Sequence, residues 1–201
     1  MGSSSFTAAT PAPPVSNVFV YGSLLADDVV RVLLNRVPPS SPAVLPHYQR
    51  FSIKACVYPA IVPAQDKKVN GKVLFGITPP ELYILDAFED VEYERTTADV
   101  LFKDGSKNLQ ADIYVWVNKT DPNLCGEWDF EEWKLLHMED FLKMTKAFME
   151  EMELPDSKTG VATIFCLVRS FRLKFSSPFA DYTQSVAALQ RASLIRIVEC
   201  F

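Results

Sequence analysis

The amino-acid sequence predicts an α+β fold in which a twisted or barrel-like mixed β-sheet carries helices packed on its outside. Three observations lead to this prediction. Short β-branched and aromatic runs end in glycine, asparagine or proline, as strands bounded by turns do. Two segments begin with helix-capping residues and continue with apolar residues at helical spacing. Strands and helices do not follow a strict βαβ rhythm, which disfavours a doubly wound parallel sheet.

The first predicted strand is Asn17 to Tyr21, which lies between Pro14 and the pair Gly22-Ser23. A helix should follow, with Asp27 or Asp28 as its capping residue. Four apolar residues give this helix one buried side, and two prolines end it: Val29, Val30, Leu33, Leu34, then Pro38-Pro39.

Several short strands should come next. Phe51 to Tyr58 is one, and Ala60 to Pro63 can continue it. Asn70-Gly71 is the strongest local turn signal in the chain, and it leads into a further strand from Lys72 to Ile77.

The segment from Thr78 to Glu81 has the composition of a helix start. Thr78 and Glu81 are spaced as a capping box, and Pro79 suits the first helical position. This helix should continue through Leu82 and Leu85 to about Phe88. Strands are then expected at residues 94–102 and 111–117, joined by a turn around Asp104-Gly105.

A long helix should begin at Asp129, with Glu132 in its first turn, and end at Pro155. Its apolar residues recur at three- and four-residue steps, which predicts a packing face: Leu135, Met138, Phe141, Leu142, Phe148, Met149 and Met152.

Charge divides the 201-residue chain unevenly. Residues 1–154 hold 14 basic and 22 acidic residues, whereas residues 155–201 hold 6 and 3. We therefore expect a disordered leader at 1–16, a folded domain at 17–154 and an atypical basic, apolar tail at 155–201. The acidic main body argues against nucleic acid as a partner.

The remaining composition excludes several other classes. Neither the two histidines nor the four cysteines are spaced as metal ligands, so we expect no metal site. No apolar run reaches the roughly 18–20 residues that span a bilayer, and the opening residues lack the features of a secretory signal. We expect a soluble cytoplasmic protein without membrane association.

The first candidate site is the turn Tyr21, Gly22, Ser23 and Leu24. A glycine turn between a strand and a helix can direct several backbone N–H groups at one carboxylate or oxyanion. A plain strand-to-helix turn explains the same residues equally well. Ser23 as a nucleophile would need a base such as His47 or His137, and the second glycine of a nucleophile elbow is missing.

The second candidate site is Glu89, in the segment LDAFEDVEYER. Leu85 and Leu82 precede it by four and seven residues, so all three share one apolar helix face. Partial burial and the nearby helix C-terminus both favour the neutral carboxyl group, which suits proton transfer near neutral pH. Alternatively, Glu89 faces water or pairs with Arg95. Tyr93 and Arg95 share one face of the next strand and can line a cleft beside Glu89 or form a surface pair.

Together, these segments resemble a known family. FVYGSL, NGKVLFGIT and LDAFEDVEYER occur in the order found in the gamma-glutamylcyclotransferase-like superfamily. The segment YVWVNKTDPNLCGEWDFEEWKLLHMEDFL is similar to the plant avirulence-induced-gene family within it. The resemblance covers roughly residues 17–150.

This resemblance implies a small mixed β-barrel flanked by helices, with a pocket built by the turn from Tyr21 through Leu25 to Ala26. It implies that Glu89 is the general acid/base of a reaction that releases 5-oxoproline from a gamma-glutamyl amine or peptide. That substrate supplies its own nucleophile, so no metal or redox cofactor is expected. The resemblance does not fix an oligomeric state.

Two features depart from the family pattern. Asp90 stands where many relatives have a glycine after the glutamate, and the tail differs from the family's usual charged, helical end. Both features suggest an alternative function, a non-catalytic module that binds a small molecule or a partner in a defence or stress response. A third possibility is that the basic tail touches an anionic membrane surface.

Overall fold

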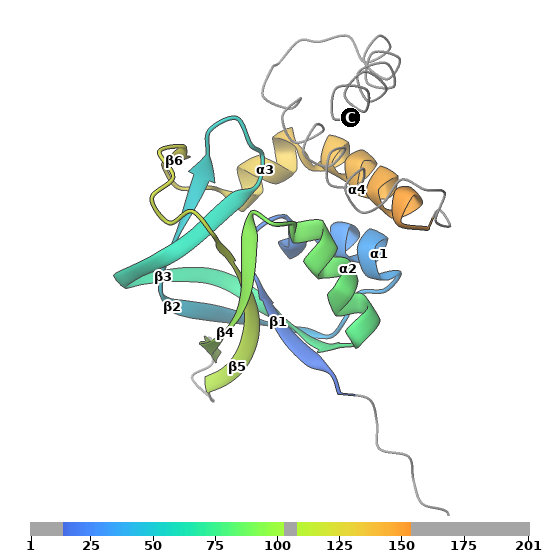
Figure 1. The fold of residues 1–201 in the computed structure, drawn as a ribbon, viewed down its shortest axis with the longest axis horizontal. Helices are drawn as coiled ribbons and strands as arrows, with labels where there is room; N and C mark the ends of the chain where they lie inside the picture. Colours follow the sequence, from blue (N-terminus) through green and yellow to red (C-terminus); the bar gives the residue numbers. More distant parts are fainter. Residues whose placement is uncertain (1–13, 103–107, 154–201) are drawn as a thin grey trace, which may run out of the picture.

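The computed structural model describes residues 14–102 and 108–153 (Figure 1). The predicted turn at Asp104-Gly105 and the predicted leader and tail lie wholly or largely outside these residues. Within them, no helix is both long and apolar enough to cross a membrane. The elements in chain order are β1 Ser16–Val20, the 3-10 helix η1 Ser23–Leu25, α1 Asp27–Leu34, β2 Ser40–Ile53, β3 Pro59–Ile77, α2 Pro79–Glu89, β4 Tyr93–Phe102, β5 Asn108–Trp116, β6 Leu124–Cys125, α3 Phe130–Leu136 and α4 Met138–Glu153.

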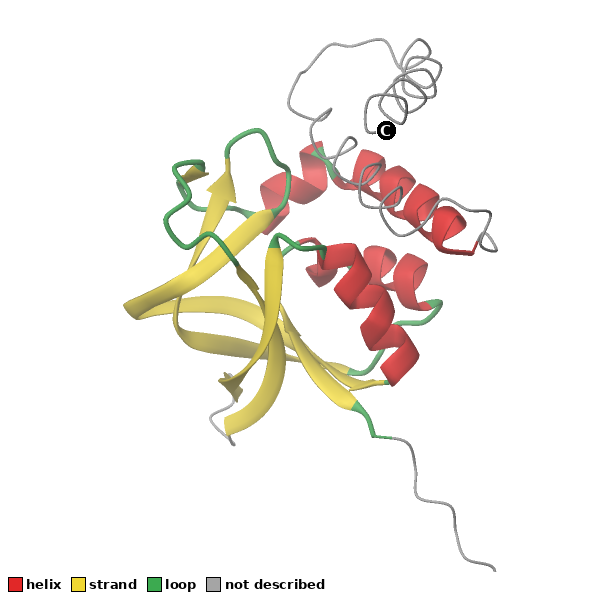
Figure 2. Cartoon of the chain, in the orientation of Figure 1, coloured by secondary structure: helices red, strands yellow, loops and turns green. Residues whose placement is uncertain are grey.

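Five strands close into a mixed barrel. β1 pairs antiparallel with β3 and parallel with β5, where Val18 lies opposite Asp112. The barrel continues through the antiparallel pairs β5–β4, β4–β2 and β2–β3, and the last of these pairs closes it at β3. β6 pairs with the end of β2 outside this ring. The helices gather beside one side of this barrel (Figure 2). The predicted fold class, a small mixed barrel flanked by helices, is therefore confirmed.

Alternating side chains divide the apolar residues into two cores. Phe19 of β1 and Tyr21, the residue after the strand, join an inner core to which all five barrel strands contribute. Val18 and Val20 point the other way, into a second core shared with α1, α2, α3 and α4. This period of two is what a strand with both faces covered requires. Tyr21, directly after the strand, lines a pocket together with residues of α2 and α4.

The turn predicted at Asn70-Gly71 is wrong, because both residues lie inside β3 and pair with Val44 and Ala43 of β2. Gly71 serves close packing instead. A Cβ atom there would lie 2.6 Å from the Phe19 ring and would also strike the carbonyl oxygen of residue 20. The β2–β3 hairpin turns at residues 54–58, in the second half of the strand predicted from Phe51 to Tyr58. Gly71 is therefore required for close packing between strands, although the pair Asn70-Gly71 is also typical of a turn.

Two helix predictions also need correction. Neither Asp27 nor Asp28 caps α1, because both lie inside the helix and Ala26 occupies the capping position. The Asp27 carboxylate instead accepts a hydrogen bond from Lys72. The long helix is divided at residue 137 into α3 and α4, which turns Leu135 outward to 86% exposure. The bend brings aromatic residues of both helices into one core, where the rings of Trp133 and Phe141 pack edge to face, 5.2 Å apart.

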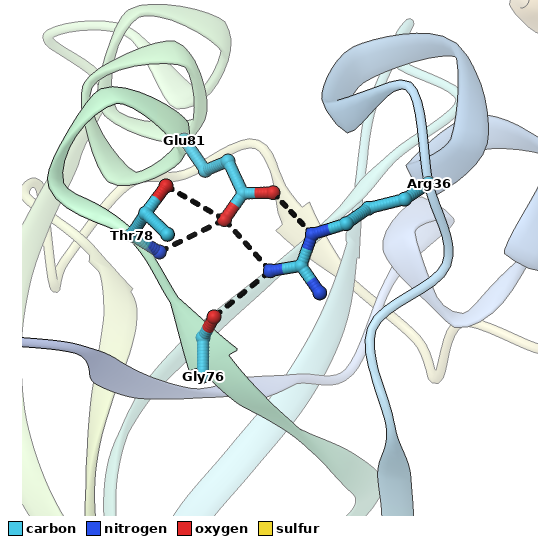
Figure 3. A network of polar contacts seen from close by, with 4 residues as sticks. All are labelled: Arg36, Gly76, Thr78 and Glu81. Carbon is cyan, nitrogen blue, oxygen red and sulfur yellow. Dashed lines mark hydrogen bonds and ion pairs between the residues drawn. The ribbon is translucent and has the colours of Figure 1, made fainter. Parts of the chain in front are cut away.

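The predicted starts of two helices are confirmed. The Asp129 carboxylate accepts a hydrogen bond from the Glu132 amide at 2.8 Å. At the start of α2, Glu81 accepts from the Thr78 amide at 2.8 Å and from its hydroxyl at 2.9 Å (Figure 3). Arg36 adds a two-point ion pair with Glu81 and donates to the Gly76 carbonyl at 2.8 Å. These contacts fix α2 to the barrel, and Glu89 is the last residue of this helix.

Candidate active site

A pocket lies where the end of β1 meets the helices. Its walls come from the turn after β1, the start of β3, the end of α2, the strands β4 and β5, and α4. The lining is mostly apolar and aromatic, with two carboxylates: Phe19, Val20, Tyr21, Gly22, Ser23, Leu24, Tyr58, Pro59, Phe88, Glu89, Tyr93, Tyr114, Phe141, Met144, Ala147, Phe148 and Glu151.

The turn after β1 lines this pocket with residues 21–24. In η1 the amides of Leu25 and Ala26 donate to the carbonyls of Gly22 and Ser23, at 2.9 and 3.0 Å. The amides of Ser23 and Leu24 come before the first such bond, so they have no acceptor within this helix. Gly22 is required by space, because a Cβ atom there would lie 2.9 Å from the ring of Pro59. The backbone can thus approach β3 closely and leave amides available for an anion.

Two side chains hold the residue that enters this turn. Arg50 donates to the Tyr21 carbonyl at 2.8 Å, and its guanidinium lies 5.2 Å from the centre of the Trp128 ring. Burial lowers the pKa of Arg50, an effect opposed by the charges of Glu127 and Asp129. The Tyr21 hydroxyl donates to the Tyr114 carbonyl at 2.6 Å. Tyr21 is therefore fixed through its backbone and through its side chain.

Glu89 is half-buried and lines the same pocket as the residues from Tyr21 to Leu24. Its charge is felt by two phenols of the lining. Burial is the main cause that raises the pKa of Tyr21 and of Tyr114, and the negative charge of Glu89 raises both pKa values further. Both hydroxyl groups consequently stay protonated near neutral pH. The carboxylate thus shares its pocket with two protonated phenols and with the turn after β1.

The other predicted site residues divide into two groups. Tyr93 is buried, lines the pocket and donates from its hydroxyl to the Pro59 carbonyl at 2.8 Å. Leu25, Ala26 and Arg95 lie outside the lining. The Leu25 carbonyl accepts from Lys72 at 3.0 Å, and Ala26 caps α1. Arg95 forms ion pairs at the surface, at 2.7 Å with Asp86 and 3.2 Å with Asp112.

Sequence reasoning missed the wall that α4 supplies, including Glu151. The signal was available, because Glu151 follows Met144 by seven residues and Phe148 by three, and so shares their helix face. A carboxylate in an apolar stripe is the same pattern that identified Glu89. Burial raises the pKa of Glu151, in agreement with this position.

No histidine lines the pocket within the described residues. His47 is exposed on β2, and His137 lies at the α3–α4 junction beside a separate hollow that includes Trp133 and Cys56. Ser23 thus has no imidazole beside it among the described residues of this pocket, so neither histidine considered as a base for a serine nucleophile lies there.

Comparisons with known proteins agree with the fold and with the order of the motifs. A family model described as "Gamma-glutamyl cyclotransferase, AIG2-like" matches residues 18–160. The chain belongs to this family.

Members from Arabidopsis thaliana are highly similar. AIG2-like protein D is 64% identical over 143 residues, which cover 71% of this chain and 94% of that protein. AIG2-like protein C is 55% identical over 147 residues, covering 73% of this chain and 86% of that protein. The solution structure of At3g28950.1, also from Arabidopsis thaliana, superposes with a TM-score of 0.55 at 42% identity, over 76% of this chain and 92% of that one. Family membership makes this chain gamma-glutamylcyclotransferase-like, and the substrate and the residues that act on it are considered next.

Proposed function

We propose that the chain is a gamma-glutamylcyclotransferase that releases 5-oxoproline from a gamma-glutamyl amine or peptide, with Glu89 as the general acid/base. One observation carries the proposal: the Glu89 carboxylate and the turn from Tyr21 to Leu24 line one pocket. In this proposal the catalytic unit spans residues 17–154 and works in the cytoplasm on a small substrate, without a metal or a redox cofactor.

The reaction is an acyl transfer within one molecule. Glu89 takes a proton from the α-ammonium group of the substrate, and the free amine attacks the γ-carbonyl carbon to form the ring. As the bond from that carbon to the leaving nitrogen breaks, Glu89 returns the proton to this nitrogen, and the ring nitrogen loses its second proton, which the released amine takes up. The products are 5-oxoproline and a protonated amine. No water is consumed, and no protein nucleophile is needed.

The pocket offers what this sequence of steps requires. The amides of Ser23 and Leu24 can hold the substrate α-carboxylate or the oxyanion that forms at the γ-carbonyl. Aromatic and apolar walls can keep the glutamyl chain folded, which places the amine near the carbonyl and removes an entropic cost. The hydroxyl groups of Tyr21 and Tyr93 already donate to backbone carbonyls, so towards the substrate their oxygens act as acceptors of fixed position, which suits its α-ammonium group.

The proposal is tested by the substitution Glu89→Gln, with Glu94→Gln as the matched control, because Glu94 is an exposed glutamate five residues further along the chain. We expect Glu89→Gln to lower 5-oxoproline release about 10³-fold without a change in melting temperature, as loss of a general acid/base does. Glu94→Gln should behave as wild type. Absence of 5-oxoproline from the wild-type protein across a panel of gamma-glutamyl amines and peptides would contradict the proposal.

The alternative is a non-catalytic module that binds small molecules or partners in a defence or stress response, and two sequence features favour it. Asp90 places a second negative charge directly after Glu89, and residues 155–201 form an atypical basic, apolar tail. Saturable binding of a gamma-glutamyl compound by the wild-type protein, with no product formed, would favour this alternative.

A further inference from the structure

The pocket carries two carboxylates and no positive side chain among the described residues that line it. Glu89 comes from the end of α2, and Glu151 comes from the last turns of α4. The rest of the lining is apolar or aromatic, apart from the Ser23 hydroxyl and the phenols. A cationic group of a ligand in this space can therefore meet a carboxylate at either of two places, and low-polarity walls strengthen that attraction.

Glu151 is held on the pocket side of α4. Ala147 and Phe148 lie four and three residues before Glu151 and line the same wall. Met144 precedes Glu151 by seven residues, or two helical turns, and lines it as well. The side chain is half-buried, and burial raises the pKa of its carboxyl group. A carboxylate in such a position is costly when unpaired, and a cation bound beside it removes that cost.

In the proposed reaction, no cationic group of the glutamyl half of the substrate remains for Glu151 to bind. The single cationic group of that half, the α-ammonium, is assigned to Glu89, and its α-carboxylate is assigned to the amides of the turn. What remains of the substrate is the amine that leaves. If Glu151 contacts the substrate, the group that it contacts therefore belongs to the leaving amine.

We infer that Glu151 determines specificity for a leaving amine with a second positive charge, so that the preferred substrates are mono-gamma-glutamyl conjugates of diamines. This inference rests on the proposed function. A leaving group with a carboxylate would meet two like charges without a compensating basic side chain in the described lining. A neutral alkylamine would fill the apolar space and leave Glu151 unpaired.

Three substrates whose leaving amines each contain four carbon atoms test the inference: the gamma-glutamyl amides of 1,4-diaminobutane, 1-aminobutane and 4-aminobutanoate. For the wild-type chain we expect kcat/KM to fall in that order, with about a tenfold difference between the cationic and the neutral amide. Glu151→Gln should reduce this difference to within about twofold, with the neutral amide unaffected. Glu150→Gln, which removes an exposed carboxylate from the same helix, should keep the wild-type order.

Equal kcat/KM for the cationic and neutral amides in the wild-type chain would overturn the inference. A uniform loss on all three substrates in Glu151→Gln would also do so, because it would indicate a structural role. If none of the substrates yields 5-oxoproline, the proposed function fails, and titration calorimetry with the same three amides then decides the inference separately. Tighter binding of the cationic amide that is lost in Glu151→Gln supports it, and equal or absent binding overturns it.

Discussion

The two ends of α2 are held by different kinds of contact. At its start, Thr78 and Glu81 bond to each other across three residues, and Arg36 joins them. At its end, Phe88 packs edge to face against Phe141 and Phe148, more than fifty residues further along the chain. The first end is specified mainly by neighbours in sequence, and the second mainly by the fold. The proposed chemistry lies at the second end, so the site depends on packing that no local signal encodes.

Phe88→Ala should have the largest effect on stability. Phe88 is 4% exposed, and its loss would leave a cavity between α2 and α4 beside Glu89. We expect the free energy of unfolding to fall by about 3–4 kcal/mol, as measured by urea denaturation. Tyr83→Ala in the same helix is the control, since Tyr83 is 63% exposed, and it should cost less than about 0.5 kcal/mol. Similar losses in both variants would show that the C-terminal end of α2 does not depend on packing against α4.

Gly22→Ala tests the turn that faces this end of α2. The added methyl group would meet the ring of Pro59, so we expect a loss of about 1–3 kcal/mol in stability. Displaced amides should also lower kcat/KM for 5-oxoproline release more than tenfold. Ser23→Ala changes the neighbouring residue without that clash and should keep most of the activity. Complete loss of activity in Ser23→Ala would instead indicate that the hydroxyl takes part in the reaction.

Glu81→Gln tests the N-terminal end. Arg36 lowers the pKa of Glu81 from its ordinary 4.5 to about 2. Since the folded-state pKa is the lower one, the stabilisation is present above about pH 4.5 and is lost as the pH falls from 4.5 towards 2. The side chain of Arg36 is 40% exposed, so solvent screening reduces the effect, and we expect Glu81→Gln to cost about 1–2 kcal/mol at pH 7.

Thermal denaturation from pH 7 down to pH 2.5 measures this effect. The difference between the wild-type chain and Glu81→Gln should shrink over the acidic part of that range. Glu131→Gln, which removes a well-exposed partner of Lys134, should show almost no difference at any pH. A constant difference for Glu81→Gln would mean that the charge of Glu81 is not what holds α2.

The contrast between the two ends also explains what the sequence could predict. Helix starts were predicted correctly where the capping residues bond to near neighbours in sequence, as at Thr78 with Glu81 and at Asp129 with Glu132. The signals that failed belong to residues whose role depends on distant strands or helices. Gly71 makes room for Phe19, and Leu135 is turned outward because the helix bends at residue 137.

The candidate site shows the same limit. Tyr21, Gly22 and Glu89 were identified because each carries a local pattern, a glycine turn or a carboxylate on an apolar helix face. Arg95 was predicted from strand alternation, but the acidic partners that hold it at the surface come from α2 and β5. The spacing of Glu151 on the apolar face of α4 could be read from the sequence, but that this face closes the pocket of Glu89 follows from tertiary packing.

Asp90→Gly should have the smallest effect and should be stabilising. Asp90 is the C-cap that follows α2, with φ 64° and ψ −176°, a backbone region that almost only glycine adopts without strain. Its carboxylate accepts from the Val91 amide at 2.5 Å, which offsets part of that strain. We expect Asp90→Gly to raise the free energy of unfolding by about 0.5–1 kcal/mol and Asp90→Asn to leave it nearly unchanged, both measured by urea denaturation. A change in kcat/KM shared by the two variants would report the charge beside Glu89, whereas a change confined to Asp90→Gly would report the backbone. Destabilisation by glycine would show that the bond to Val91 outweighs the strain, and that the aspartate is a structural cap at this end of α2.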